Sequence, residues 1–285
     1  MRIGLTSPVV TLVPGAHSAW ETTASVDDLV RVAQAADRLG FDHLTCSEHV
    51  AVPAEIAAQR GGTYFDPLAT LSYLAAGTER IRLATQVVVL GYHHPLALAK
   101  RYGTLDRLSG GRVVLGVGVG SLEEEFDLLG VPFEGRGALA DDQLAALRTA
   151  FTQDQPAHHG PHIDFSGFVV EPRPVQSSVP LWVGGRTMRS LRRATTYADG
   201  WVPFGLSADE LATMLTRVDL PDDFEVVLGP ARPLDPTSDP ERSARALVRL
   251  REAGATLATV RLAADSVDHY VEQLEAMHTL ALGIE

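Results

Sequence analysis

RIRLATQVVVL (80–90), GYHHPLALAKRYGTLDRLSGGR (91–112) and VVLGVGVGSLEEEF (113–126) form one continuous stretch of the chain. The first piece is a β-branched apolar run, the second has the spacing of an amphipathic helix, and the third is an apolar run ending in alternating glycines. Parallel strands need a long crossover connection, which is usually a helix. The stretch therefore predicts a parallel βαβ unit.

Gly116, Gly118 and Gly120 occupy alternate positions and are predicted to share one face of the second strand. A strand without side chains on one face either makes room for something flat or lets backbone approach closely. A Rossmann site would need G-x-G-x-x-G opening a helix, with an acidic residue ~20 positions later. Here the third glycine comes one residue early and the glycines lie mostly inside the strand, which argues against a dinucleotide site.

The strand–helix alternation extends from this unit to both ends of the chain. Eight strands, each followed by a helix, predict an α/β protein with a closed (β/α)8 TIM barrel, in one domain over 1–285. An open doubly wound sheet is the alternative, but eight units favour closure. The strands are expected at 2–6, 43–47, 81–90, 113–119, 180–185, 200–204, 224–229 and 256–262. The helices are expected at 26–39, 67–76, 95–108, 122–129, 138–151, 187–197, 208–218, 241–253 and 267–281.

One segment departs from this alternation. Residues 152–178, and especially 158–174, are rich in Pro, His and Gly and are expected to form an excursion outside the barrel after the fourth strand. Its clustered histidines are interpreted as part of a solvated loop. His93 and His94 open the helix at 95–108, and no metal site is expected there because adjacent residues do not face each other on a helix.

The composition narrows the possible functions. The formal charge is 24 − 36 = −12, which argues against nucleic acid as a partner because phosphates attract basic surfaces. The single cysteine, Cys46, excludes an internal disulfide and favours a reduced compartment. No apolar run approaches the roughly 18 residues of a membrane span, and no leader precedes the first strand. We therefore expect a soluble, cytoplasmic protein.

In such barrels the chemistry lies where strands end and βα loops begin. Ser47-Glu48-His49 stands at the end of the second strand, and histidine can give or take a proton near neutral pH. A hydrogen-bonded loop pair or a salt bridge is the alternative interpretation. At the end of the fifth strand, Gly184-Gly185-Arg186 precedes a helix, so free backbone N–H groups and a guanidinium could meet an anion.

Arg186, Arg189 and Arg193 recur at i, i+3 and i+7 and are expected to share a helix face. This pattern favours binding of a cofactor phosphate. A solvated basic face is the alternative.

Specific blocks of the sequence carry a family resemblance. They are SEH (47–49), LSGGRVVLGVGVGSLEEEF (108–126), GVPFEGRG (130–137), EPRPVQ (171–176), PLWVGG (180–185) and ADGW (198–201). Together they closely resemble the bacterial-luciferase-like flavin and deazaflavin oxidoreductases, over about residues 2–204. The last 80 residues match only in architecture.

The resemblance implies a TIM barrel whose cofactor ring lies over the carboxyl ends of the strands. It implies His49 as the general acid/base. It implies a bulge of the third strand near Gln86 and Val87, often formed through a non-proline cis peptide. Ser121 departs from the aromatic residue or glutamate of relatives, which puts a sugar-phosphate substrate in doubt. The residues implied to hold the cofactor are Glu48, Gln86, Val87, Val89, Gly120, Ser121, Gly184, Gly185 and Arg186.

The activity implied by the resemblance is hydride transfer between C5 of coenzyme F420 and a small organic substrate, in a homodimer. One alternative is an FMN-dependent monooxygenase that uses reduced flavin and oxygen. The other is a barrel that binds flavin or deazaflavin without turnover.

Overall fold

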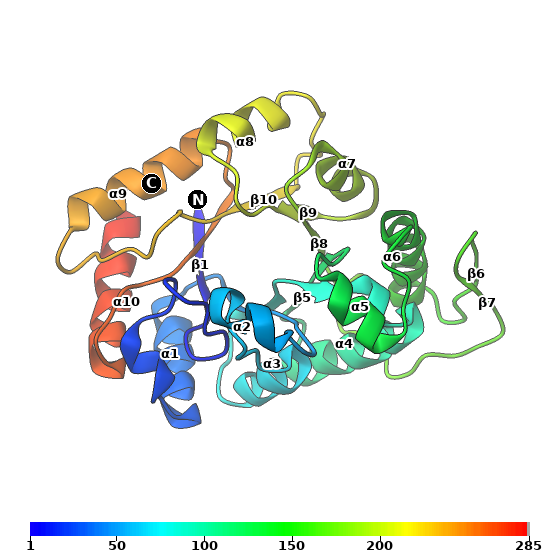
Figure 1. Ribbon diagram of the computed structural model, residues 1–285, viewed down its shortest axis with the longest axis horizontal. Coiled ribbons are helices and arrows are strands. Elements are labelled where there is room, and N and C mark those ends of the chain that lie inside the picture. Colours follow the sequence, from blue (N-terminus) through cyan, green and yellow to red (C-terminus); the bar gives the residue numbers. More distant parts are fainter. Residues whose placement is uncertain (284–285) are drawn as a thin grey trace.

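The computed structural model describes residues 1–283. Eight parallel strands close into a barrel, with the chain's helices around it (Figure 1). Pairing of β3 with β5 and of β1 with β11 completes the ring, which confirms the predicted (β/α)8 class. The ring consists of β1 (Arg2–Thr6), β2 (His43–Cys46), β3 (Arg82–Thr85), β5 (Val113–Gly118), β8 (Leu181–Gly184), β9 (Gly200–Val202), β10 (Glu225–Leu228) and β11 (Leu257–Val260).

The helices begin and end close to the predicted positions. Ser25 accepts a hydrogen bond from the Asp28 amide at the start of α1, and Gly40 ends that helix with φ 79°. The main helices are α1 (Val26–Leu39), α3 (Pro67–Ala76), α4 (Pro95–Ser109), α5 (Glu123–Leu129), α6 (Arg136–Thr152), α7 (Met188–Tyr197), α8 (Ala208–Leu215), α9 (Pro240–Glu252) and α10 (Val267–Leu282). Short 3₁₀ turns lie at η1 (Ala19–Thr22) and η2 (Leu90–Tyr92). A further helix, α2 (Ala54–Arg60), was not predicted. None of the helices within residues 1–283 is long and apolar enough to cross a membrane.

The predicted third strand is in fact two strands. β3 ends at Thr85 and β4 (Val88–Val89) resumes beyond a cis peptide between Gln86 and Val87. The bulge and its non-proline cis bond therefore lie where the family resemblance placed them. β4 pairs with β5 and lies outside the closed ring.

The barrel interior is filled by a compact apolar layer. Its buried members are Ala84, Val114, Trp182, Val202, Val227 and Leu257, with Val87 packed against them. A larger core lies between the strands and the helices. The interior is therefore a packed core rather than a channel, and a ligand must approach from one end.

Charged residues close the amino end of the barrel. His43, fully buried, lies between Asp42 and the Thr259 hydroxyl, each 2.8 Å from a ring nitrogen. Arg82 bridges Asp42 and Glu225. Burial raises the pKa of Asp42, but hydrogen bonds and charge from His43 and Arg82 outweigh it and lower the pKa to about 2. These interactions close and stabilise the amino end of the barrel. We therefore expect the functional site at the carboxyl end.

The excursion between α6 and β8 projects beyond α6 as the β6 (His158–His159) and β7 (Asp164–Phe165) hairpin (Figure 1). Asp142 on α6 anchors it by accepting from the amides of His162 and Ile163 and by pairing with His158 at 2.7 Å. His158 is therefore tied to a carboxylate of α6, whereas His159 and His162 are exposed, as the predicted solvated loop requires.

Candidate functional site

A cavity of about 360 Å³ opens at the carboxyl ends of the strands. β1, β9, β10 and β11 contribute to its wall with the residues that end or follow them, and Gln86 joins them from the bulge. The Gln86 side-chain oxygen is buried and has no hydrogen-bond partner among the described residues. An unsatisfied buried acceptor is costly, so this wall is prepared for a ligand that donates a hydrogen bond. The lining residues include Thr6, Gln86, Pro203, Phe204, Leu228, Gly229, Pro230, Thr259 and Arg261.

The glycine face of β5 lets other chain segments approach closely. A Cβ on Gly116 would stand 2.0 Å from the carbonyl oxygen of Thr85, and a Cβ on Gly118 would stand 2.8 Å from a methyl of Val87. A Cβ on Gly184 of β8 would stand 3.0 Å from a methyl of the same Val87 side chain. The alternating glycines were predicted either to make room for something flat or to let other backbone approach closely. At Gly116 and Gly118 the structure shows the close approach. The room left by the missing side chains is taken by the bulge.

Gly120 lies beyond the end of β5, with φ 78°. A Cβ there would meet the ring of Phe126 at 2.5 Å and Val89 at 2.9 Å. Ser121 follows as an exposed residue. The bulge therefore brings together four of the predicted site residues, which are Val87, Val89, Gly120 and Gly184.

Glu48 supports the bulge through its carboxylate. One oxygen accepts from the Val89 amide at 2.7 Å, and the other lies 2.7 Å from Nε2 of His93. Its own amide donates to the Val87 carbonyl, and the hydroxyl of Ser47 donates to the Gln86 carbonyl at 2.8 Å. Because both carboxylate oxygens of Glu48 are engaged, its side chain holds the segment that carries Val87 and Val89.

His49 pairs with a different carboxylate. Its Nδ1 lies 2.7 Å from Oε2 of Glu125 on α5. No hydrogen bond to Nε2 is found within residues 1–283, and 21% of the His49 side chain is exposed. A carboxylate at Nδ1 favours the tautomer that carries its proton there, which leaves Nε2 as a proton acceptor. His49 is therefore arranged to take a proton at Nε2.

The Glu125 carboxylate is fully buried and accepts several hydrogen bonds. Besides His49, its donors are the Tyr92 hydroxyl at 2.9 Å and the amides of Val50 and Ala51. Burial raises the pKa of Glu125, but the hydrogen bonds from His49, Ala51 and Tyr92 outweigh it, and the net pKa is lowered. Glu125 therefore stays ionised beside His49.

The predicted phosphate loop lies at the end of β8. Gly185 has φ 133°, and a Cβ on it would stand 2.6 Å from Ser190, so only glycine fits here. Arg186 is exposed directly before Thr187, which caps α7. The predicted shared face of three arginines is wrong, because Arg193 is buried and bonds to Asp141 and to the carbonyl of Gly137.

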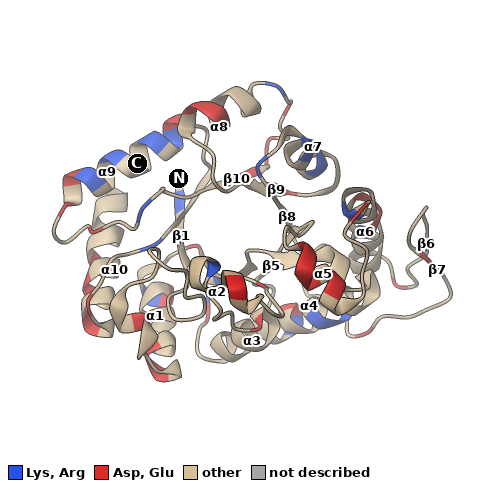
Figure 2. Cartoon of the chain, in the orientation of Figure 1, with Lys and Arg blue, Asp and Glu red and all other residues tan. Residues whose placement is uncertain are grey.

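Two residues at the carboxyl end of the barrel were not predicted as site residues from the sequence. Glu125 is one of three consecutive glutamates, but it lies i+3 from the buried Leu122, so helical periodicity could have shown that it turns inward. Arg261 directly follows β11 and lines the cavity. No ion pair of Arg261 is found within residues 1–283, and only the strand end itself could have pointed to it. Figure 2 shows the acidic face of α5 and the basic residues of α7 and α9.

Comparisons of sequence identify relatives. The model of the family described as luciferase-like monooxygenase matches residues 7–265. An uncharacterized protein of Mycobacterium tuberculosis (strain ATCC 25618 / H37Rv) is 32% identical over 201 residues, which cover 66% of this chain and 69% of that protein. An FMNH2-dependent dimethylsulfone monooxygenase of Pseudomonas putida is 27% identical over 184 residues, covering 63% of this chain and 49% of that protein.

Solved structures share the fold. The monooxygenase RslO1 from Streptomyces bottropensis superposes with a TM-score of 0.77 at 22% identity, covering 99% of both chains. An F420-dependent secondary alcohol dehydrogenase in complex with an F420–acetone adduct superposes with a TM-score of 0.73 at 15% identity, covering 97% of this chain and 98% of that one. Since the family model spans most of the sequence, this chain belongs to the luciferase-like monooxygenase family.

Proposed function

We propose that this protein is an F420-dependent oxidoreductase that moves a hydride between deazaflavin and a small organic substrate. The observation that carries the proposal is the His49–Glu125 pair at the carboxyl end of the barrel, with Nδ1 fixed and Nε2 free. One structural neighbour is named for F420 and one sequence relative for FMNH2, so a flavin-type cofactor is supported for the fold. The finer choice of F420 rests on the resemblance of the block LSGGRVVLGVGVGSLEEEF (108–126) to the deazaflavin branch.

The residues present fit a flat ring cofactor. The cavity is of ligand size, and the orphaned oxygen of Gln86 offers an acceptor to a ring N–H. Val87, Val89 and Gly120 would form the apolar support beside the ring. Gly184, Gly185 and Arg186 would hold a phosphate with backbone N–H groups and a guanidinium. When bound, the deazaflavin supplies a two-electron hydride acceptor or donor.

The chain's own chemistry is proton transfer and orientation. When a hydride leaves the carbinol carbon of an alcohol, the hydroxyl proton passes to Nε2 of His49, and a carbonyl forms. In the reverse direction Nε2 returns the proton to the carbonyl oxygen. Glu125 stabilises the imidazolium that exists between these events, and Tyr92 holds Glu125 in place. Glu48 would keep the ring support in position through Val89.

The second candidate is an FMN-dependent monooxygenase, favoured by the dimethylsulfone monooxygenase relative. A third and remote candidate is a cofactor-binding barrel without turnover, against which the His49–Glu125 pair argues. The absorbance and mass of the cofactor carried by the purified protein separate the first two. Bound deazaflavin, reduced by a secondary alcohol without oxygen uptake, supports the proposal. Bound FMN with oxygen uptake supports the monooxygenase.

A further inference from the structure

A second, smaller cavity adjoins the main one where β11, β1 and β2 end side by side. Thr6 and Arg261 line both cavities, and Ser47 also lines the smaller one. β1 and β11 are paired with Leu5 opposite Val260, so Thr6 and Arg261 leave adjacent strands at the same level. The smaller cavity measures about 40 Å³. One water needs roughly 10–15 Å³ on this measure, so it accommodates a group of two or three heavy atoms.

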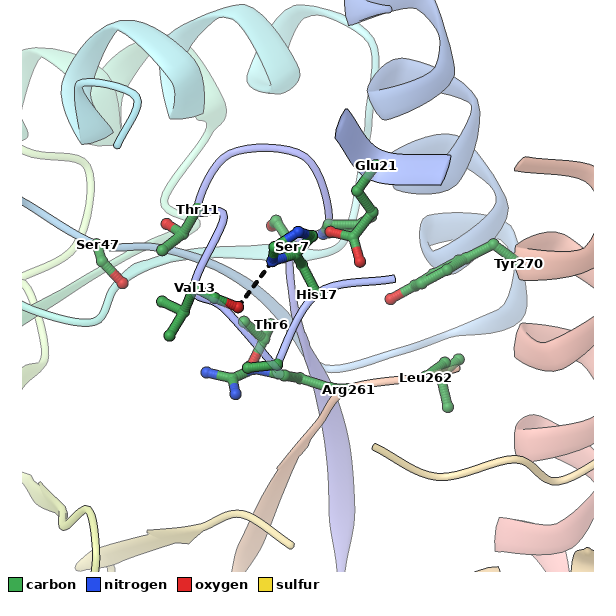
Figure 3. A pocket seen from close by; sticks show the side chains of 12 residues that line it. Thr6, Ser7, Thr11, Val13, His17, Glu21, Ser47, Arg261, Leu262 and Tyr270 are labelled. Atoms are coloured by element: carbon green, nitrogen blue, oxygen red, sulfur yellow. Dashed lines mark hydrogen bonds between the residues drawn. The ribbon is translucent and has the colours of Figure 1, made fainter. Parts of the chain in front are cut away.

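The lining of this small cavity is rich in unpaired hydrogen-bond donors. The hydroxyls of Ser7, Thr11 and Tyr270 are buried and have no partner among the described residues. The side chains of Ser7 and Tyr270 are 3% and 1% exposed. Buried hydroxyl groups normally have a hydrogen-bond partner. Three without one in a single cavity indicate that a bound ligand supplies the acceptor. Figure 3 shows them with Arg261, whose guanidinium extends toward the side on which Thr11 and Ser47 lie.

The acid in the same wall is already engaged. Both oxygens of Glu21 accept backbone N–H groups, from Val9 at 2.9 Å and from Ser18 at 2.7 Å. His17 donates a hydrogen bond from Nδ1 to the Val13 carbonyl at 2.7 Å (Figure 3, dashed line). Arg261 has no acidic partner within residues 1–283. The free groups are thus a cation and hydroxyl donors, which match a small oxyanion.

The position relative to His49 suggests what the oxyanion belongs to. Ser47 lines the small cavity and lies two residues before His49 in the same loop. Tyr64 packs edge-on against His49, with ring centroids 4.6 Å apart. Thr11, which lines the small cavity, forms an antiparallel bridge with Tyr64, so the cavity lies near the ring that packs against His49. A ligand held by Arg261 would therefore extend toward His49.

We infer that this cavity is a carboxylate-binding subsite, and that the substrate is a small organic acid. Arg261 and the hydroxyls of Ser7 and Thr11 would bind the carboxylate, and the rest of the substrate would extend out of this subsite. This rests on the proposed function, since it names the substrate class of the same site. The same oxyanion chemistry could come from a cofactor phosphate, and the experiment separates the two sources.

The test measures binding without turnover. The affinities of 3-phenylpropanoate and of 3-phenylpropanamide are compared at pH 7 by ligand-observed NMR titration, for the wild type, Arg261→Gln and Arg217→Gln. Arg217 is an exposed arginine outside both cavities, so its variant is matched in charge change. We expect the wild type and Arg217→Gln to prefer the acid about tenfold or more, and Arg261→Gln to lose that preference. Thr11→Val should lose part of it.

Three results would overturn the inference. The first is equal affinity of the wild type for acid and amide, and the second is a preference for the acid that survives in Arg261→Gln. The third is a loss of F420 and FMN binding in Arg261→Gln with riboflavin binding unchanged, which would assign the oxyanion to the cofactor. Failure of the proposed function is seen separately, as absence of F420 binding by a wild type that still prefers the acid. Unfolding temperatures of the variants confirm that each is folded.

Discussion

His49 and Glu125 are 76 positions apart in the chain, yet Nδ1 of the first lies 2.7 Å from Oε2 of the second. The loop after β2 carries the histidine, and α5, which follows β5, carries the glutamate, so the connections after two strands that flank β3 in the ring build one proton-transfer unit. The buried carboxylate fixes which imidazole nitrogen carries the proton. The proposed chemistry depends on this relationship.

Replacement of His49 by alanine should lower turnover and leave cofactor binding within about twofold of the wild type. Acid–base catalysis typically contributes ~10²–10⁴-fold, and we expect a loss of that order in kcat. A screen of secondary alcohols, enones and imines with F420 supplies the substrate for this assay. An unchanged kcat in the variant would remove His49 from the mechanism.

Glu125→Gln should lower kcat by roughly 10²–10⁴-fold, because an amide at this place can donate to Nδ1 and favour the wrong tautomer. KM and the Kd of the cofactor should stay near the wild-type values. Glu124→Gln is the matched control, since Glu124 is the exposed neighbour on the same helix. Equal effects of the two substitutions would mean that α5 matters only for its charge.

The lowered pKa of Glu125 also predicts a pH dependence of stability. A carboxyl with a depressed pKa stabilises the folded protein above its ordinary pKa of 4.5, and that contribution is lost as the pH falls through the folded-state pKa. The Tm difference between the wild type and Glu125→Gln should therefore be largest near neutral pH and shrink below pH 4.5. Thermal unfolding from pH 7 to pH 3 measures it, with Glu124→Gln as the control. A difference that grows toward low pH would contradict the assigned ionisation.

The glycine face of β5 predicts a rescue experiment. Gly118→Ala places a methyl 2.8 Å from the Val87 side chain, and overpacking of this kind costs typically about 1–3 kcal/mol of unfolding free energy. Adding Val87→Ala should recover part of that loss. Gly116→Ala should not be rescued in this way, because its methyl would meet the Thr85 carbonyl oxygen at 2.0 Å. Denaturant unfolding of the single and double variants gives the comparison. Recovery in both pairs would show that the side-chain clash is not the cause.

Arg186→Ala should weaken binding of a phosphate-bearing cofactor by roughly tenfold to a hundredfold, the value of one charge-assisted hydrogen bond. Binding of a truncated cofactor without the phosphate should change much less. The loss should shrink at high salt where long-range attraction contributes. Arg192→Ala, on an exposed position of α7, is the control. If Arg186→Ala weakens binding of the phosphate-bearing and of the truncated cofactor equally, Arg186 does not bind the phosphate.

Local patterns were sufficient to predict the barrel. Each apolar run at a strand position and each capped amphipathic segment is a short-range signal, so the order of strands and helices followed from the sequence. α2 was missed because AEIAAQR is short and flanked by Pro53 and Gly61. The third strand was drawn too long, because periodicity does not show where a ladder is interrupted.

The site was only partly predictable for a different reason. Strand ends can be located along the chain, and His49 and Arg186 were predicted that way, whereas Gln86 was predicted from the family resemblance; their roles stay predictions. Side-chain pairing across the barrel is decided by three-dimensional packing. The pairing of His49 with Glu125 rather than Glu48, and the burial of Arg193 against Asp141, therefore emerged only from the structure.

Isothermal titration of the purified protein with F420 and with FMN tests the proposed F420 dependence. We expect saturable binding of F420 in the micromolar range, tighter than that of FMN. Tighter binding of FMN, with no saturation by F420 in that range, would contradict it and assign the protein to the flavin-dependent monooxygenases.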